Sequence, residues 1–93
     1  KSSKNLIEKK GTIVNKRGLH ARAAARFSKL AENFHSEIKV EVDGLSVSAR
    51  SIMGLMMLGA SQGVDVLITA QGEDEKEGLN ALVELIKKCF DEE

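Results

Sequence analysis

Apolar and polar residues alternate in three stretches of the chain, and each stretch predicts a β-strand. Successive side chains of a strand point to opposite faces, so alternation is typical of a strand with one buried face. The clearest case joins residues 37–42 to residues 45–49 through Asp43-Gly44, a pair that favours a tight hairpin. The third alternating stretch is residues 64–70, and a fourth strand is predicted at residues 6–14, which have Ile13 and Val14 near their end. The hairpin should bury one face, made of Ile38, Val40, Val42, Leu45, Val47 and Ala49.

Three further stretches predict helices: two repeat apolar residues at intervals of three and four, which is typical of a helix with one buried side, and one is a short run that is apolar nearly all round. The first helix should cover residues 21–33. The second should follow Ser51, a favoured N-cap residue, and end at Gly59. The third should begin near Asp74, which has the spacing of a capping box to Glu77. Its buried stripe should comprise Leu79, Leu82, Val83, Ile86 and Phe90.

The predicted order of elements is therefore β-α-β-β-α-β-α. This order, with a tight central hairpin and amphipathic helices around it, indicates an α+β fold of two layers. Three helices should cover one face of a mostly antiparallel, four-stranded sheet. At 93 residues the chain should form one domain over residues 1–93, with residues 1–5 as a frayed N-terminal extension.

Composition narrows the class of protein. The single cysteine, Cys89, cannot form an internal disulfide, which suits a reducing compartment. Apolar runs stay well below the ~20 residues needed to cross a bilayer, and the basic start of the chain does not resemble a signal peptide. We therefore expect a cytoplasmic protein that does not associate with membranes.

The charges are unevenly distributed although the net charge is zero. Residues 1–50 hold eleven Lys and Arg against five Asp and Glu, whereas residues 51–93 hold three against nine. A basic half favours an anionic group or an acidic protein surface as its partner. Nucleic acid is the competing class of partner, but the chain lacks both interleaved aromatic residues and a high pI, so we expect no nucleic-acid binding.

The most informative stretch runs from Gly18 to Arg26. His20 lies between a glycine loop and a run of Ala and Arg, which are strong helix formers. It should therefore sit at a helix N-terminus, where unpaired N–H groups and a partial positive charge stabilise phosphate. Arg22 adds a fork of donors that suits phosphate oxygens. The stretch predicts that His20 accepts a phosphoryl group, while the plainer alternative is a solvated residue in the capping region.

The other histidine, His35, falls in the turn after the first helix and should be a surface residue. A metal site built on His20 and His35 has no carboxylate or thiol pattern to support it, so we expect no metal and no cofactor.

Two segments give the chain its resemblance to a known family. Gly18-Leu19-His20-Ala21-Arg22-Ala23-Ala24 and Ser51-Ile52-Met53-Gly54-Leu55-Met56 resemble the histidine-containing phosphocarrier protein (HPr) family of the phosphoenolpyruvate-dependent phosphotransferase system. The resemblance covers residues from about 7 to 90 and implies an open-faced β-sandwich. One departure is Ala23, where the family often has proline; proline fixes φ in the first helical turn, so its loss should loosen that turn only slightly.

The resemblance also implies roles for single residues. His20 would be phosphorylated on Nδ1 by enzyme I, and would pass the group to an A component of an enzyme II. Arg22 would steady the phosphoryl group. Ser51 matches the serine that a dedicated kinase modifies in many bacteria. The chain would thus be a carrier with a covalent phosphohistidine, part of a transferase system and not a catalyst by itself.

A partner surface is expected beside this site. The helix after Ser51 is apolar nearly all round, so part of it should be exposed, whereas Met57 should fill the core. The resemblance implies that partners contact Ile52, Met53 and Met56. To these we add Ala21 and two basic residues of the first helix, Arg26 and Lys29, for which an ordinary solvated surface is the alternative.

Two branches of the phosphotransferase system fit the sequence equally. The chain can feed sugar uptake, or it can belong to a regulatory, nitrogen-related branch that feeds no sugar permease. The chemistry at His20 is identical in both. We expect the chain to act as a monomer.

Overall fold

The computed structural model describes residues 6–91, so the predicted fraying of residues 1–5 lies outside the described part. The order of elements confirms the predicted β-α-β-β-α-β-α, with a short 3-10 turn added at the end. The elements are β1 (Ile7–Thr12), α1 (Ala21–Ala31), β2 (Glu37–Val42), β3 (Leu45–Ser48), α2 (Ile52–Met57), β4 (Asp65–Gln71), α3 (Glu75–Lys87) and η2 (Cys89–Asp91).

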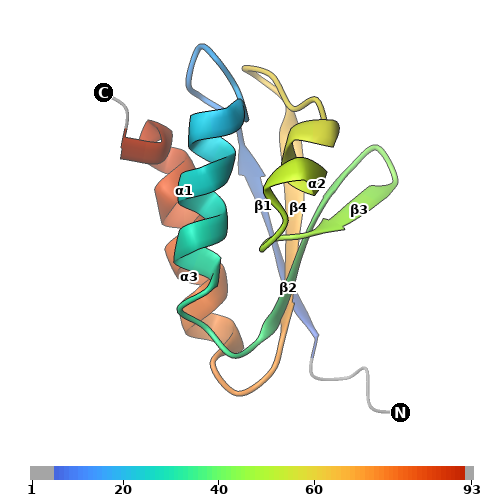
Figure 1. Ribbon diagram of the computed structural model, residues 1–93. Coiled ribbons are helices and arrows are strands. Elements are labelled where there is room, and N and C mark those ends of the chain that lie inside the picture. Colours follow the sequence, from blue (N-terminus) through green and yellow to red (C-terminus); the bar gives the residue numbers. More distant parts are fainter. Residues whose placement is uncertain (1–5, 92–93) are drawn as a thin grey trace.

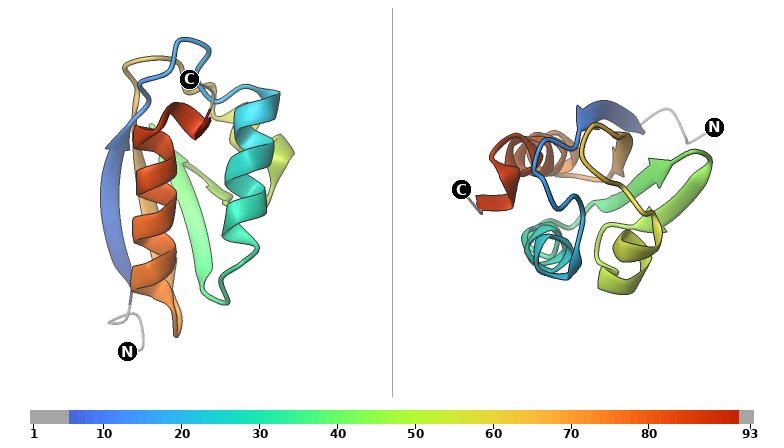
Figure 2. Two further views of the ribbon diagram at one scale, coloured as in Figure 1. Left: turned by 90° about the vertical axis from the view of Figure 1, so that its left-hand side faces the viewer. Right: turned by 90° about the horizontal axis from the view of Figure 1, so that it is seen from above.

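The four strands form one sheet in the order β1-β4-β2-β3, and all three neighbouring pairs are antiparallel. Val40 marks the register, because it pairs with Ile68 of β4 on one side and with Val47 of β3 on the other. The helices lie on one side of this sheet, with α1 and α3 side by side and α2 next to β3 (Figures 1 and 2). The expected two-layer, open-faced α+β fold is confirmed. No helix within residues 6–91 has the length and apolar character to cross a membrane.

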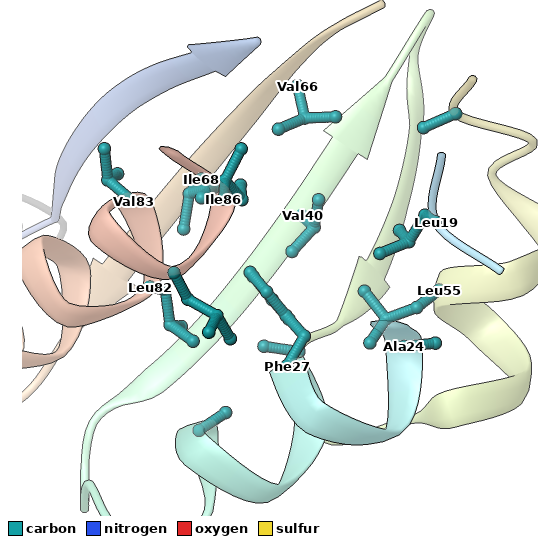
Figure 3. Packing of buried hydrophobic residues seen from close by; sticks show 14 of the residues in the cluster. Leu19, Ala24, Phe27, Val40, Leu55, Val66, Ile68, Leu82, Val83 and Ile86 are labelled. Atoms are coloured by element: carbon teal, nitrogen blue, oxygen red, sulfur yellow. The ribbon is translucent and has the colours of Figure 1, made fainter. Parts of the chain in front are cut away.

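The core lies between the sheet and the helices and is almost entirely aliphatic (Figure 3). Phe27 of α1 and Phe90 of η2 are its fully buried aromatic residues, and their rings meet edge to face with centroids 6.4 Å apart. Leu19, which immediately precedes His20, is also buried and points into the core near Ala24 and Leu55 (Figure 3). The segment before α1 is therefore anchored by packing.

The hairpin prediction was wrong for Leu45, whose side chain is 47% exposed. Leu45 directly follows the turn, at the start of the edge strand β3, and the turn projects beyond α2 (Figure 1). No helix covers the sheet at that point, so alternation alone does not bury the residue. The first strand is also shorter than predicted, and Leu6 and Val14 at its predicted ends are exposed.

Phe90 is buried as predicted, but it does not belong to the helical stripe of α3. The helix ends at Lys87, and Cys89, Phe90 and Asp91 all have φ between 56° and 62°. Left-handed conformations cost non-glycine residues free energy and persist only where their surroundings hold them. Here burial of the Phe90 ring and hydrogen bonds from the Arg26 guanidinium to the carbonyls of Phe90 and Asp91 hold the turn.

The predicted capping box of α3 is wrong. Asp74 occupies the N-cap position, but its side chain makes no capping hydrogen bond. Its carboxylate instead accepts hydrogen bonds from the backbone N–H of His35 and from the N–H and hydroxyl of Ser36. The local hydrogen bond at this turn is made by Glu75 instead, because its Oε1 accepts from Gly72 N–H. Asp74 thus links the turn after α1 to the turn before α3.

These donors favour the ionised carboxylate, above all the Ser36 hydroxyl and then the His35 N–H, and they lower the pKa of Asp74 from 3.8 to about 2. The folded pKa lies below the unfolded one, so the stabilisation is present above pH 4 and disappears as the pH falls from about 4 to 2. We expect Asp74→Asn to unfold at a lower temperature than the parent at pH 7, and the difference to shrink over that pH window. Thermal unfolding by circular dichroism checks this, and a difference that stays constant down to pH 2 contradicts it.

Candidate phosphoryl-acceptor site

His20 is the N-cap residue of α1. Its backbone is extended (φ −79°, ψ −178°), and its carbonyl accepts the first helical hydrogen bond, from Ala24 N–H, at 2.8 Å. The ring turns back over the helix end, where Nδ1 accepts a hydrogen bond from Arg22 N–H at 3.3 Å. A neutral imidazole with Nδ1 as acceptor carries its proton on Nε2. The half-exposed ring therefore presents the lone pair of Nδ1 to the amide-rich, electropositive end of α1.

The loop that leads to His20 is fixed against the loop between α2 and β4. Gly18 has φ +67°, and a Cβ on it would lie 2.4 Å from the carbonyl oxygen of Ala60. The same carbonyl accepts a hydrogen bond from Leu19 N–H at 2.8 Å. A second hydrogen bond joins the same two loops near the ends of β1 and β4. It runs from Gly63 N–H to the carbonyl of Ile13, at 2.7 Å. Figure 1 shows both loops at the same end of the molecule as the start of α1.

The basic residues of α1 divide into two groups. Arg22 and Lys29 are exposed, and Arg22 lies in the first turn beside His20. Arg26 is also on the surface, but its guanidinium bonds the carbonyls of Phe90 and Asp91, 2.8 and 2.9 Å away. The helical spacing gave no sign of this contact, because the acceptors lie more than sixty residues away in sequence. For Arg26 and Lys29 a partner contact stays a prediction.

Ser51 is the N-cap residue of α2. Its hydroxyl accepts a hydrogen bond from Gly54 N–H at 2.9 Å, as its position in the sequence predicts. The turn before it is tied to α1, because the buried Ser28 hydroxyl donates to the carbonyl of Arg50 at 2.9 Å. The helices α1 and α2 lie side by side and are seen end-on in the right-hand view of Figure 2. Ser51 is half-buried in this arrangement.

The helix that begins after Ser51 exposes an apolar surface, as predicted. Ile52 and Met56 are each 42% exposed, and Met53 is 71% exposed. The prediction that Met57 fills the core is wrong, since its side chain is 70% exposed. A helix of six residues on one side of a sheet buries only one edge, which here is Leu55 together with the C-cap residue Leu58. Met57 lies one turn after Met53, on the same exposed side.

His35 is exposed in the turn after α1, so the two histidines lie at opposite ends of this helix. Within residues 6–91, no three His, Cys, Asp or Glu side chains are grouped so that they could hold a metal ion. The start of α1 thus brings together one imidazole, the first backbone amides of the helix and the neighbouring Arg22.

Comparison with known proteins agrees with this geometry. The family model described as the PTS HPr component phosphorylation site matches residues 7–88. The phosphocarrier protein HPr of Cupriavidus necator is 46% identical over 87 residues, which are 94% of this chain and 98% of that protein. The crystal structure of HPr-C-His from Thermoanaerobacter tengcongensis superposes with a TM-score of 0.89 at 52% identity, covering 94% of this chain and 98% of that one.

A second crystal structure from the same organism, described as an HPr dimer, matches with a TM-score of 0.73 at 54% identity. It covers 84% of this chain and 90% of that one. The family model includes both segments on which the resemblance was based, and the match to the Cupriavidus necator protein extends over nearly the whole of both chains. The chain belongs to the HPr family, the phosphocarrier proteins of the phosphotransferase system.

Proposed function

We propose that Nδ1 of His20 accepts a phosphoryl group from phosphorylated enzyme I and passes it to an A component of an enzyme II. One observation carries this proposal: Nδ1 is turned toward the N-terminus of α1 and accepts a hydrogen bond from its backbone. A nucleophilic nitrogen and an anion-binding helix end are thus in one place.

The transfer itself needs little from the protein besides position and charge. The Nδ1 lone pair forms a bond to phosphorus as the bond between phosphorus and the donor breaks, and Nε2 keeps its proton. The Arg22 N–H that pointed at Nδ1 then lies beside the arriving phosphoryl oxygens. The Arg22 guanidinium adds a second donor and a positive charge. To deliver the group, the bond between Nδ1 and phosphorus breaks as the acceptor forms its own bond to phosphorus.

Incubation with labelled phosphoenolpyruvate and enzyme I tests this function. The chain should take up one phosphoryl group that acid removes, because phosphohistidine is labile in acid and phosphoserine is stable. Addition of A components should then discharge the protein. Comparing sugar-specific with regulatory A components separates the sugar branch from the nitrogen-related branch, which the site itself does not distinguish. Absence of uptake from phospho-enzyme I would reject the proposal.

We further propose that one copy of the chain is sufficient for transfer. The imidazole and the amide that bonds it belong to the same chain, which supports a carrier that acts as a monomer. The dimeric relative shows that the fold can associate. Sedimentation of the unphosphorylated and phosphorylated protein, alongside the rate of transfer at several concentrations, checks whether a monomer is the active form.

We propose Ser51 as a second, regulatory phosphorylation site, for a dedicated kinase where one is present. Its hydroxyl sits at the start of α2, directly before the exposed residues Ile52 and Met53. A phosphate there adds nearly two negative charges to the edge of the partner surface. A helix N-terminus tolerates this charge, so the fold should stay intact while an acidic partner docks less well.

Ser51→Asp is expected to reduce kcat/KM for phosphorylation by enzyme I about tenfold, which corresponds to about 1.4 kcal/mol. Ser51→Asn is the matched control, because asparagine caps a helix as well as aspartate does but carries no charge. Steady-state transfer rates at two ionic strengths measure the effect, which salt should weaken. Equal rates for the Asp variant and the parent, or equal losses in both variants, would contradict the regulatory role.

A further inference from the structure

Three polar residues within residues 6–91 have buried side chains: Asn15, Ser28 and Ser36. Ser36 bonds the Asp74 carboxylate, and Ser28 bonds the turn before Ser51. Asn15 is 1% exposed and belongs to the loop that leads to His20. Burying an amide is costly unless it is hydrogen-bonded, so its partners indicate what the residue does.

The side chain of Asn15 closes the loop on itself. Its Nδ2 donates to the carbonyl of Gly18 at 2.9 Å, while its own backbone carbonyl accepts from Gly18 N–H at 3.2 Å. Both polar backbone groups of Gly18 are thus bonded to one residue. Gly18 is also the residue with φ +67°, where the chain turns toward α1.

Only Leu19 separates this closed loop from His20. Leu19 is held by its buried side chain and by the hydrogen bond from its N–H to Ala60. The orientation of the backbone at His20 is therefore fixed by two contacts. Asn15 holds Gly18, and the carbonyl of Ala60 holds Leu19. The hydrogen bond at 3.3 Å between Nδ1 and Arg22 N–H depends on that orientation.

We propose that Asn15 is a positioning residue for phosphoryl transfer, which holds Gly18 so that Nδ1 of His20 faces the N-terminus of α1. The inference rests on the proposed function of His20 and adds a residue to it. In this role Asn15 acts through its hydrogen bond to the carbonyl of Gly18. A displacement of a reacting atom by about 1 Å can cost on the order of 100-fold in rate, so a loop contact of this kind affects the chemical step.

Two variants test the role of Asn15. Asn15→Leu keeps a side chain of similar volume and removes the donor. Asn15→Asp keeps the shape but replaces the amide donor with a carboxyl group, which cannot donate to the carbonyl of Gly18 when it is ionised. Ser36→Ala is the matched control, because it also removes a buried polar contact but lies beyond the far end of α1. All are measured well below their unfolding temperatures, so that loss of stability does not enter the rates.

In transfer from phospho-enzyme I, both Asn15 variants should lower kcat about tenfold or more while KM stays within twofold, since the surface of α2 is unchanged. Ser36→Ala should change neither. Nitrogen-15 spectra of the His20 ring give a second readout. The parent should show mainly the tautomer with the proton on Nε2, and the Asn15 variants should show a smaller fraction of it.

Parental kcat together with a parental tautomer ratio in whichever Asn15 variant folds would overturn the inference and leave the proposed function intact. Equal losses of kcat in the Asn15 and Ser36 variants would also overturn it, because the effect would then be general destabilisation. If the parent itself takes up no phosphate, the proposed function fails. The tautomer ratio then still decides whether Asn15 positions the ring.

Discussion

His20→Ala is expected to reduce phosphate uptake from phosphoenolpyruvate and enzyme I to an undetectable level. The variant lacks the nitrogen that forms the bond to phosphorus, and the neighbouring amides and Arg22 can bind an anion but cannot accept the group covalently. The fold should persist, since loss of an N-cap contact costs only about 1 kcal/mol. Quantitative labelling with phosphoenolpyruvate, followed by acid release, measures the loss.

Two variants serve as controls for this result. His35→Ala removes the other histidine, beyond the opposite end of α1, and should take up phosphate like the parent. His20→Asn retains a side chain that caps helices well, so it should match the parent in stability and still accept no phosphate. Acid-labile uptake that survives in His20→Asn would remove His20 from the mechanism.

Gly18→Ala should lower both the stability of the fold and the rate of transfer, with an effect second only to that of His20→Ala. A steric cost and a conformational cost coincide at this residue. The left-handed backbone at φ +67° is unfavourable for alanine, and the new Cβ would meet the carbonyl of Ala60 at 2.4 Å. The loop has to move to relieve this contact. We expect the free energy of unfolding to fall by at least about 2 kcal/mol, and the rate of transfer to His20 to fall with the displaced loop.

Gly59→Ala is a matched control for the conformational cost. Gly59 has φ +63°, nearly the same backbone, but a Cβ there has nothing within 4 Å. It should lose only about 1 kcal/mol. Urea unfolding of both variants separates the steric contribution from the conformational one. Equal losses of stability in the two variants would mean that the contact between Gly18 and Ala60 does not constrain the loop.

Much of the fold could be predicted because the evidence for it is local. Strand β2 begins and ends at the predicted residues, since its strict alternation and the Asp-Gly turn both lie within eight residues. The start of α1 at Ala21 follows equally from the contrast between the glycine loop and the Ala-Arg run. Because these two features fix the N-terminus of α1, the position of His20 could be predicted as well.

The errors concern features that depend on distant parts of the chain. Whether Met57 and Leu45 are buried depends on which element covers them, and neither residue's neighbours in sequence decide that. Asp74 resembles a local cap, but its carboxylate accepts three hydrogen bonds from the turn after α1 instead. The role of Asn15 was equally hidden, because a single asparagine in a loop has no periodicity that marks it as buried.

We propose that the phosphoryl group is carried on Nδ1 of His20, at the N-terminus of α1. Nuclear magnetic resonance of the nitrogen-15-labelled protein, phosphorylated with phosphoenolpyruvate and enzyme I, tests it most directly. We expect phosphorus–nitrogen coupling at Nδ1 of His20 and a large shift of the Arg22 amide proton, as its acceptor changes from nitrogen to a phosphoryl oxygen. Coupling at Nε2 or at His35, or an Arg22 amide that does not respond, would contradict it.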